Sequence, residues 1–291
     1  MNINLLASYA ATSSFVLLWG AAAIFTRWGL DDASPMLLLL FRFSIALALL
    51  ILIGRYRGHL WPQSGTWRQV MLTGMLMIGG YSVCYFQAMA HGVTPGLIAT
   101  IMGIQPILTL CLVERSMNTV KLSGLCIALI GLVTLVWDSL ISSQIAPLGL
   151  LLALIALLCM TFGAILQKKI RQHPAQVLPL QYLIGLLFCL VLLPFEQIHL
   201  NVSAHFVVAV LFLGILISVV AQILLYSLLN RGNVVNVTSL FYLVPVITAV
   251  LDYLVLGNVL PWSGWMGMAA ILLGIGLVFR ASKTNQSSET Q

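Results

Sequence analysis

The sequence predicts an all-α integral membrane protein in which ten transmembrane helices form two inverted halves of five helices each. Three observations lead to this prediction. The chain is 61% apolar and only 7% charged, a composition that suits lipid and that water-soluble domains do not have. Apolar runs long enough to cross a bilayer as helices recur along the whole chain. The second half of the chain also weakly repeats the first.

Each apolar run has about 18 to 24 residues, which as a helix covers a hydrocarbon core of roughly 30 Å. The runs are continuously apolar and lack the alternation of transmembrane strands, so we expect helices. The ten expected spans are residues 5–26, 35–53, 70–90, 95–113, 120–137, 147–166, 177–193, 206–229, 234–256 and 262–279.

The basic residues predict the orientation, because short loops rich in Lys and Arg stay in the cytoplasm. With a cytoplasmic N-terminus, eleven of the thirteen lie on the cytoplasmic side: Arg55, Arg57, Arg68, Arg115, Lys121, Lys168, Lys169, Arg171, Arg231, Arg280 and Lys283. Arg27 instead lies on the outer side beside Asp31 and Asp32, and Arg42 lies within the second span. We therefore expect both termini in the cytoplasm. This topology also accounts for the net charge of +6, so the charge does not indicate a nucleic-acid partner.

The internal repeat appears when the chain is aligned on itself at an offset of 139 residues. Arg42-Phe43 then falls on Gln181-Tyr182, and Pro106 falls on Pro245. Because each half has an odd number of spans, the second half enters the membrane from the opposite side. Such inverted repeats are typical of secondary transporters that open a shared site to each side in turn. We expect a first repeat over residues 1–138, a second over 147–280, and a polar cytoplasmic tail over 281–291.

The last two expected spans carry a group of residues that forms a recognisable pattern: Val244-Pro245, Tyr253, Leu256-Gly257-Asn258, Trp262 and Gly274. Together with Trp19-Gly20 and Arg42-Phe43 in the first two spans, this group resembles the EamA domain of the drug/metabolite transporter superfamily, in two copies over nearly the whole chain. The chain departs from the usual family pattern at Gly257-Asn258, where a Gly-Glu pair is common. The interval from Pro106 to Glu114 is also shorter than usual.

The resemblance implies a multi-pass carrier of small metabolites in a bacterial-type cytoplasmic (inner) membrane, commonly an exporter of amino acids or related polar compounds. Two alternatives stay open: a multidrug or lipophilic-cation efflux transporter, and, from a different class, a membrane channel. The first span contains no Asp or Glu, which disfavours the proton-coupled cation export of small four-span multidrug relatives. A channel would need a filter of charged rings or exposed carbonyl groups, and the inverted repeat favours a carrier.

Arg42 is the most informative single residue, because it lies about 10 Å below the outer surface at roughly 1.5 Å per residue. A charge near the middle of the membrane costs about 2.5 to 3.5 kcal/mol, so a partner is expected. Asp252 at similar depth is one candidate, and the carboxylate of a substrate is another. The alternative is a structural Arg that snorkels to the surface or joins two helices. Gln181 occupies the repeat-related position.

Polar and aromatic side chains on five expected spans form the rest of the candidate substrate-binding set, with Arg42 and Gln181. These residues are Trp19, Tyr81, Tyr85, Gln105, Gln222, Tyr226, Tyr242 and Tyr253. They offer hydrogen bonds at their tips and apolar area along their bodies, which suits an amphipathic solute. Helix packing and membrane interfaces use the same residue types, so each one singly also fits a structural role.

Two further groups of residues are candidates for roles in the switch between outward and inward access. Gly79 and Gly80 can loosen the third span, while Pro106 and Pro245 remove backbone hydrogen bonds at repeat-related positions, so all four are candidate hinges. Helix packing is the alternative role for each of them. The carboxylates of Asp252 and Glu114 are candidates for an ion pair or a proton site.

An enzyme is not expected, because no motif places catalytic groups at membrane depth. His59 and His173 fall in inner loops, and no nucleotide-binding loop occurs. The five cysteines lie within spans without metal-binding spacing, so we expect neither a metal nor a cofactor. The expected partners are a small-molecule substrate and the lipid bilayer, with no nucleic acid, and the protein is a monomer or a homodimer.

Overall fold

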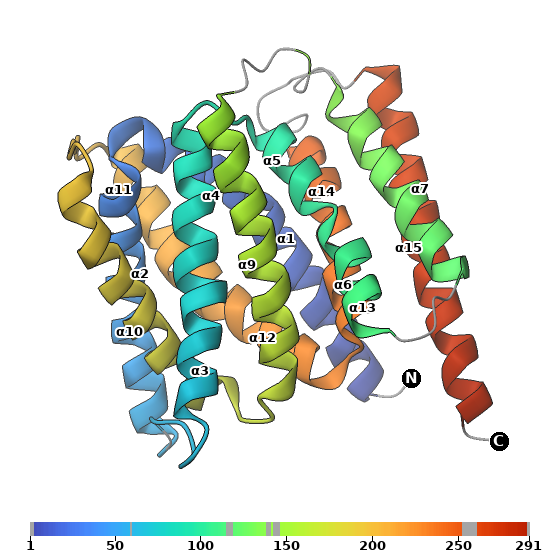
Figure 1. Ribbon diagram of the computed structural model, residues 1–291, viewed down its shortest axis with the longest axis horizontal. Coiled ribbons are helices and arrows are strands. Elements are labelled where there is room, and N and C mark those ends of the chain that lie inside the picture. Colours follow the sequence, from blue (N-terminus) through green and yellow to red (C-terminus); the bar gives the residue numbers. More distant parts are fainter. Residues whose placement is uncertain are drawn as a thin grey trace.

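The computed structural model describes residues 3–58, 60–114, 119–137, 141, 146–251 and 261–289. Within them the regular elements are helices, joined at one point by an isolated antiparallel bridge between Ala33 and Leu200. The helices form one bundle, and the N- and C-termini lie at the same end of it (Figure 1). We call this the terminal end and the opposite one the far end. The predicted all-helical class is confirmed.

The first half of the chain contains one unbroken helix pair followed by two interrupted helices and a final straight one. Its elements are α1 (Ile3–Asp32), α2 (Pro35–Tyr56), α3 (Trp67–Gly74), the π-helical η1 (Met75–Gly80), α4 (Tyr81–Ala90), α5 (Pro95–Met102), α6 (Gln105–Val113) and α7 (Thr119–Leu135).

The second half follows the same order of long, interrupted and straight helices. Its elements are α9 (Pro147–Lys169), α10 (Pro174–Leu192), the 3₁₀ turn η2 (Leu193–Phe195), α11 (Ala204–Leu211), the π-helical η3 (Phe212–Ala221), α12 (Gln222–Arg231), α13 (Val234–Ser239), the 3₁₀ turn η4 (Leu240–Tyr242), α14 (Leu243–Leu251) and α15 (Trp262–Glu289). In both halves proline opens helices at their first position, as at Pro35 and Pro174, because its fixed φ suits that place and its missing N–H is not needed there.

Among the described residues, eight helices are long and apolar enough to cross a membrane. They are Ala10–Asp32, Pro35–Tyr56, Trp67–Ala90, Gly96–Val113, Pro147–Lys169, Pro174–Phe195, Ala204–Arg231 and Trp262–Ala281. The sequence predicts ten spans. The fifth and ninth of these coincide with the shorter apolar helices Thr119–Leu135 and Val234–Val250, and the expected ninth span continues into residues that lie outside the described ones.

Corresponding helices of the two halves run in opposite directions. α1 runs from the terminal end to the far end, whereas α9 runs from the far end to the terminal end (Figure 1). The interruptions recur as well. π-helical turns occur in η1 and η3, and breaks separate α5 from α6 and α13 from α14. The repeat that is weak in sequence is therefore clear in the backbone.

α7 and α15 pack unusually closely through glycine. A Cβ atom at Gly131 would lie 2.7 Å from the carbonyl oxygen of Gly267, and one at Gly267 would lie 2.6 Å from that of Gly131. Gly124 of α7 and Gly274 of α15 make the same close backbone contact further along the two helices. Small residues let membrane helices approach until their backbones touch, so the small residues of the last span serve packing within this chain.

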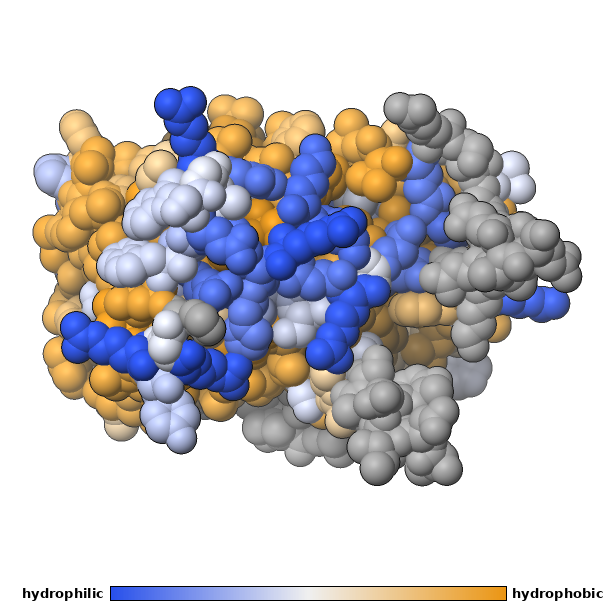
Figure 2. Space-filling model, turned by 90° about the horizontal axis from the view of Figure 1, so that it is seen from below, coloured by the Kyte–Doolittle hydropathy of each residue, from blue (hydrophilic) through white to orange (hydrophobic). Residues whose placement is uncertain are grey.

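Charge is distributed unequally between the two ends of the bundle. Hydrophilic residues gather over the terminal end, surrounded by apolar surface (Figure 2). Exposed basic residues at helix ends and in loops on this side are Arg55, Arg57, Arg68, Lys169, Arg171 and Arg231. The far end instead carries Asp32, which accepts hydrogen bonds from Asn201 and Ser203, and Glu196, which accepts one from the backbone N–H of Met36 at 2.9 Å.

Candidate functional site

A cavity of about 510 Å³ lies inside the bundle, between the two halves. Its walls include residues of α1, α2, α4, α5 and α6 from the first half and of α9, η3, η4 and α14 from the second. Near the far end it is lined by Arg27 and Trp28 in the last turns of α1. It reaches inward to Trp19, Gln105 and Phe241. No described residue of the terminal end lines it.

Five residues of the predicted substrate-binding set line this cavity, together with one predicted hinge. They are Trp19, Arg42, Tyr81, Tyr85, Gln105 and Pro245. Gln181, Gln222, Tyr226 and Tyr242 are buried but do not line the cavity. Asp252 and Tyr253 lie outside the described residues, and Glu114 lies at the terminal end.

Arg42 is buried in the wall of the cavity, with 9% of its surface exposed. Its Nε–H donates to Ser218 Oγ at 2.7 Å. The guanidinium carbon lies 5.7 Å from the ring centroid of Phe43 and 5.6 Å from that of Phe86. The titratable groups that surround it are Tyr182, Tyr81, Tyr85 and Cys189. No carboxylate among the described residues lies within ion-pair distance of it, so its charge is met by neutral groups.

Ser218 was not among the predicted site residues, although it holds Arg42 in place. It is fully buried and lies in the π-helical η3. In the sequence it is one hydroxyl within a continuously apolar run of ten residues, and serine occurs in such runs as an ordinary packing residue. The sequence gives no sign that η3 faces the second span, because that contact exists only in the tertiary structure.

Gln105 brings a second hydrogen-bond donor to the cavity wall. Its side chain is 1% exposed, and its Nε2 atom has no hydrogen-bond partner among the described residues. The residue stands at the start of α6, directly after the break at Gly103 and Ile104, and Pro106 follows it. Buried amide donors are rarely left unpaired, since the lost hydrogen bond costs about 1 to 3 kcal/mol. A bound solute that accepts this hydrogen bond would remove the cost.

Aromatic and aliphatic side chains cover most of the remaining wall. The rings of Trp19 and Phe241 meet edge to face with centroids 5.5 Å apart, and those of Tyr81 and Tyr85 lie 5.6 Å apart. Met102, Met160, Leu213, Ile217 and Val244 add apolar surface. An apolar wall with a few polar groups is the usual composition of a small-molecule site.

Gln167, Gln181 and Tyr226 form a separate buried cluster toward the terminal end. The Tyr226 hydroxyl donates to Gln181 Oε1 at 2.7 Å, and Gln181 Nε2 donates to Gln167 Oε1 at 3.1 Å. Gln181 and Arg42 occupy repeat-related positions, but only Arg42 lines the cavity. The repeat-related positions therefore hold a cation that lines the cavity and a neutral, internally bonded amide that does not.

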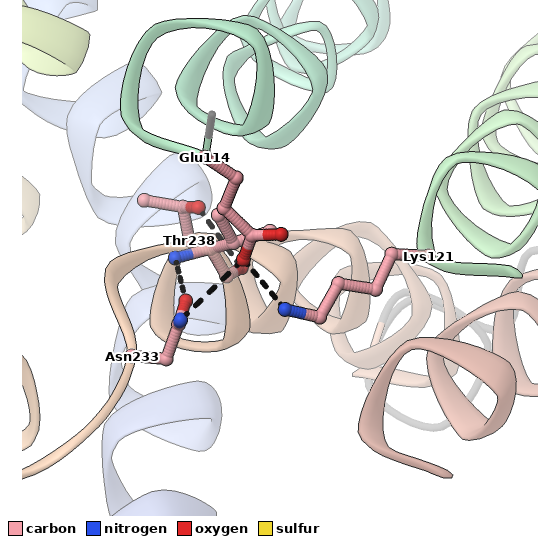
Figure 3. Close-up of polar contacts among 5 residues, drawn as sticks. Glu114, Lys121, Asn233 and Thr238 are labelled. Atoms are coloured by element: carbon pink, nitrogen blue, oxygen red, sulfur yellow. Dashed lines mark hydrogen bonds and ion pairs between the residues drawn. The ribbon is translucent and has the colours of Figure 1, made fainter. Parts of the chain in front are cut away.

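Polar contacts within the first half and between the two halves lie at the terminal end. Lys121 Nζ contacts Glu114 Oε1 at 2.5 Å, with side chains 4% and 16% exposed, and Asn233 Nδ2 lies 3.5 Å from the same oxygen. Figure 3 shows Glu114 between Lys121 of α7 and Asn233, which precedes α13. Asn233 also caps α13, because its Oδ1 accepts from the Val235 N–H at 2.8 Å. Glu114, predicted as an ion-pair or proton site, thus forms an ion pair.

Loops at the same end add further contacts between the halves. Gln172 Oε1 accepts from the backbone N–H of Gln63 at 2.9 Å, and Gln172 Nε2 donates to Thr66 Oγ1 at 2.9 Å. Arg57 Nη1 and His173 Nε2 lie 3.0 Å apart.

The predicted hinge residues lie at irregular backbone. Gly79 and Gly80 end the π-helical η1, and a Cβ at Gly80 would lie 3.0 Å from Cys159 Sγ, so this glycine also serves packing. Pro106 follows the break between α5 and α6, and Pro245 follows the 3₁₀ turn η4. All four residues thus occur where the helical hydrogen-bond pattern is interrupted.

The model of the EamA-like transporter family matches residues 7–137 and 147–280 of this chain. Similar proteins include the uncharacterized transporter YvbV of Bacillus subtilis, 25% identical over 94% of this chain and 92% of that protein. The uncharacterized inner membrane transporter YedA of Escherichia coli is 24% identical over 94% and 91%. A probable amino-acid metabolite efflux pump of Salmonella typhimurium is 24% identical over 89% and 90%.

Among solved structures, one titled only as the crystal structure of a protein superimposes with a TM-score of 0.78 at 20% identity. The match covers 94% of this chain and 98% of that one. At this level of identity the similarity establishes the fold.

Proposed function

The chain belongs to the EamA-like transporter family, and we propose that it is a secondary-active transporter that exports an amino acid or a related polar metabolite across the cytoplasmic membrane. The family and its named relatives are transporters, and the described helices make this a multi-pass membrane protein. Amino-acid metabolite efflux is what the name of the Salmonella relative states. One relative is also named as an inner membrane protein.

The cavity with its buried Arg42 is the observation that carries this proposal. Its volume of about 510 Å³ falls within the roughly 300 to 1,000 Å³ of small-molecule sites. It lies between two halves of opposite direction, which is where alternating-access carriers hold their solutes. Arg42 offers guanidinium donors that suit a carboxylate, and amino acids and related metabolites carry that group.

We further propose ten spans, with the helices Thr119–Leu135 and Val234–Val250 as the fifth and ninth. Two features support it: the termini share one end of the bundle (Figure 1), and that end carries the exposed basic residues, as cytoplasmic loops do. The terminal end is then cytoplasmic. The repeats cover residues 1–138 and 147–280, and residues 281–291 form a cytoplasmic tail. The unit is a monomer or a homodimer.

In this topology the cavity faces outward. Its lining approaches the far end, whereas polar contacts between the halves, such as those of Gln172 with Gln63 and Thr66, lie at the cytoplasmic end. Export requires the reverse arrangement as well, so these contacts must open while the far end closes. The π-helical turns and the breaks beside Pro106 and Pro245 are the places where the helices bend most easily.

Efflux of lipophilic cations, the alternative within transport, fits the cavity less well. The described residues that line it include Arg27 and Arg42 and no Asp or Glu. A positive wall repels cations, and binding a cation there would add a second uncompensated charge. The aromatic surface suits drugs and metabolites equally, so the sign of the charge decides between the two functions.

The test is solute movement in proteoliposomes that hold the purified protein. A pool of labelled amino acids and metabolites is loaded, and efflux is followed with and without an imposed pH gradient. We expect faster efflux of one class of carboxylate-bearing solutes than from protein-free liposomes. The proposal fails if no solute of the pool moves, or if dye-like cations are transported instead.

A further inference from the structure

We infer that the transported solute is a carboxylate anion with an apolar or aromatic body and no cationic group; this inference rests on the proposed function. It narrows the proposed function to the compounds related to amino acids, because free amino acids, which carry an ammonium group beside the carboxylate, are then poor substrates. N-acylated amino acids and aryl-substituted carboxylic acids fit the described class. The inference follows from the sign and the placement of the polar groups around the cavity.

The inner part of the cavity offers hydrogen-bond donors. Arg42 uses its Nε–H for Ser218, and a guanidinium has further N–H donors on its two terminal nitrogens. Gln105 Nε2 has no partner among the described residues. A carboxylate accepts several hydrogen bonds and cancels the charge of Arg42. The head group that matches this wall is therefore an anion.

An ammonium group on the solute would find no complementary charge among the described residues that line the cavity. The two charged residues there are both arginines. Arg27 is already paired with Asp31 at 3.0 Å, and both of these side chains are more than half exposed. Arg42 already lies over the rings of Phe43 and Phe86. An α-ammonium next to a carboxylate on Arg42 would stand close to a like charge, which disfavours a zwitterion.

Apolar side chains face the rest of the solute. Trp19, Phe241, Met102, Met160 and Val244 come from four different spans and line the same cavity. Removing apolar surface from water contributes roughly 25 cal/mol per Å², so a solute body of similar polarity binds better than a polar one. The head is thus recognised by charge and the body by apolar contact.

The experiment compares four solutes with the same phenyl ring in proteoliposomes. N-acetylphenylalanine and 3-phenylpropionate are anions, phenylalanine is a zwitterion, and 2-phenylethylamine is a cation. Initial efflux rates are corrected for leakage from protein-free liposomes. We expect the two anions to leave at least about tenfold faster than phenylalanine, the factor that one well-placed charge interaction supplies, and the cation not to exceed leakage.

Arg42→Gln should reduce the efflux of both anions to the leak rate, and Arg42→Lys should keep part of it, since the ammonium retains the charge without the planar fork. Arg68→Gln is the matched control, because it removes the same charge from an exposed residue outside the cavity and should leave the preference unchanged. Phenylalanine moving as fast as the anions would overturn the inference and leave the proposed function standing. If no solute moves, here or in the wider pool, both are wrong.

Discussion

Arg42 combines a buried charge with neutral partners, and this combination needs a physical explanation. A hydrogen bond from a charged donor contributes about 1.5 to 3 kcal/mol, and a cation over a desolvated aromatic ring about 2 kcal/mol. Ser218, Phe43 and Phe86 can therefore offset most of the insertion cost of the buried guanidinium. The charge itself stays uncancelled within the described residues and is available to an anionic solute.

Arg42→Gln should abolish transport while the protein still reaches the membrane at the wild-type level. Glutamine can still donate to Ser218 but lacks the charge that the carboxylate requires. Arg42→Lys should retain partial activity with a raised KM. The measurement is the initial transport rate as a function of solute concentration, normalised to the amount of protein. Unchanged kinetics in the glutamine variant would assign Arg42 a purely structural role.

Ser218→Ala should raise the KM for the solute by about tenfold, since it removes a hydrogen bond to a charged group and frees the guanidinium to rotate. Ser227→Ala is a suitable control. The Ser227 hydroxyl donates only to the carbonyl oxygen of Ile223 within the same helical run, so its loss should change the KM less than twofold. Equal effects of both substitutions would show that Ser218 does not position Arg42.

The sequence identified much of the cavity one residue at a time. Arg42 stood out because charge is costly in lipid, and the aromatic residues Trp19, Tyr81 and Tyr85 because their tips are polar. It could not separate cavity residues from buried ones of the same type. The side chains of Gln181 and Tyr226 form a hydrogen bond with each other, whereas the Gln105 amide nitrogen has no hydrogen-bond partner among the described residues. That difference depends on neighbours from other helices.

The helices of the two halves share their irregularities, although their sequences share little. Gly79 and Gly80 indicated a loosened third span, where the structure has the π-helical η1, but η3 has no such pair. In η3, Gly214 instead lets the helix approach α2, since a Cβ there would lie 3.1 Å from Ile45. The sequence thus pointed to an irregularity in the third span and gave no such sign for its counterpart.

The contact between Glu114 and Lys121 should be energetically coupled, because both side chains are largely buried. Breaking a buried pair by removing one partner is expected to lower stability by about 3 to 5 kcal/mol. The double variant Glu114→Gln, Lys121→Met should lose less than the sum of the two single variants. The measurement is a double-mutant cycle from unfolding in detergent. Additive losses would mean that the two side chains do not stabilise each other.

Gly131→Ala should sharply reduce the yield of folded protein, because the added methyl would lie 2.7 Å from a backbone oxygen of α15. Backbone cannot move aside as a flexible side chain can, so the two helices must separate. Gly276→Ala is the control, since no atom lies within 4 Å of the position of its Cβ. Yield and elution profile in detergent measure both. A normal profile for the Gly131 variant would contradict the close packing of this pair.

The molecule as a whole was more predictable than its parts. Composition, the apolar runs and the weak repeat were enough for an all-helical membrane protein in two related halves. Helix ends were less predictable. α1 extends to Asp32 rather than to residue 26, because Asp32 is held by Asn201 and Ser203 across the far end. The interruptions of the fourth and ninth expected spans lie beside Pro106 and Pro245, the predicted hinge residues, but the ends of the separate helices there could not be read from the sequence.

The cavity exists only in the assembled molecule. Its walls combine helices of both halves, so neither repeat alone would contain it. The pseudo-symmetry of the fold is broken at its wall, because Arg42 lines the cavity and its counterpart Gln181 does not. This asymmetry places a cation in the cavity wall, and it would favour an anionic solute.

The decisive measurement is a structure of the protein with a transported carboxylate bound. We expect the solute in the cavity between the halves, with its carboxylate oxygens within hydrogen-bond distance of the Arg42 guanidinium and its body against Trp19 and Phe241. A solute bound elsewhere, or one in the cavity whose carboxylate turns away from Arg42, would contradict this assignment of the site.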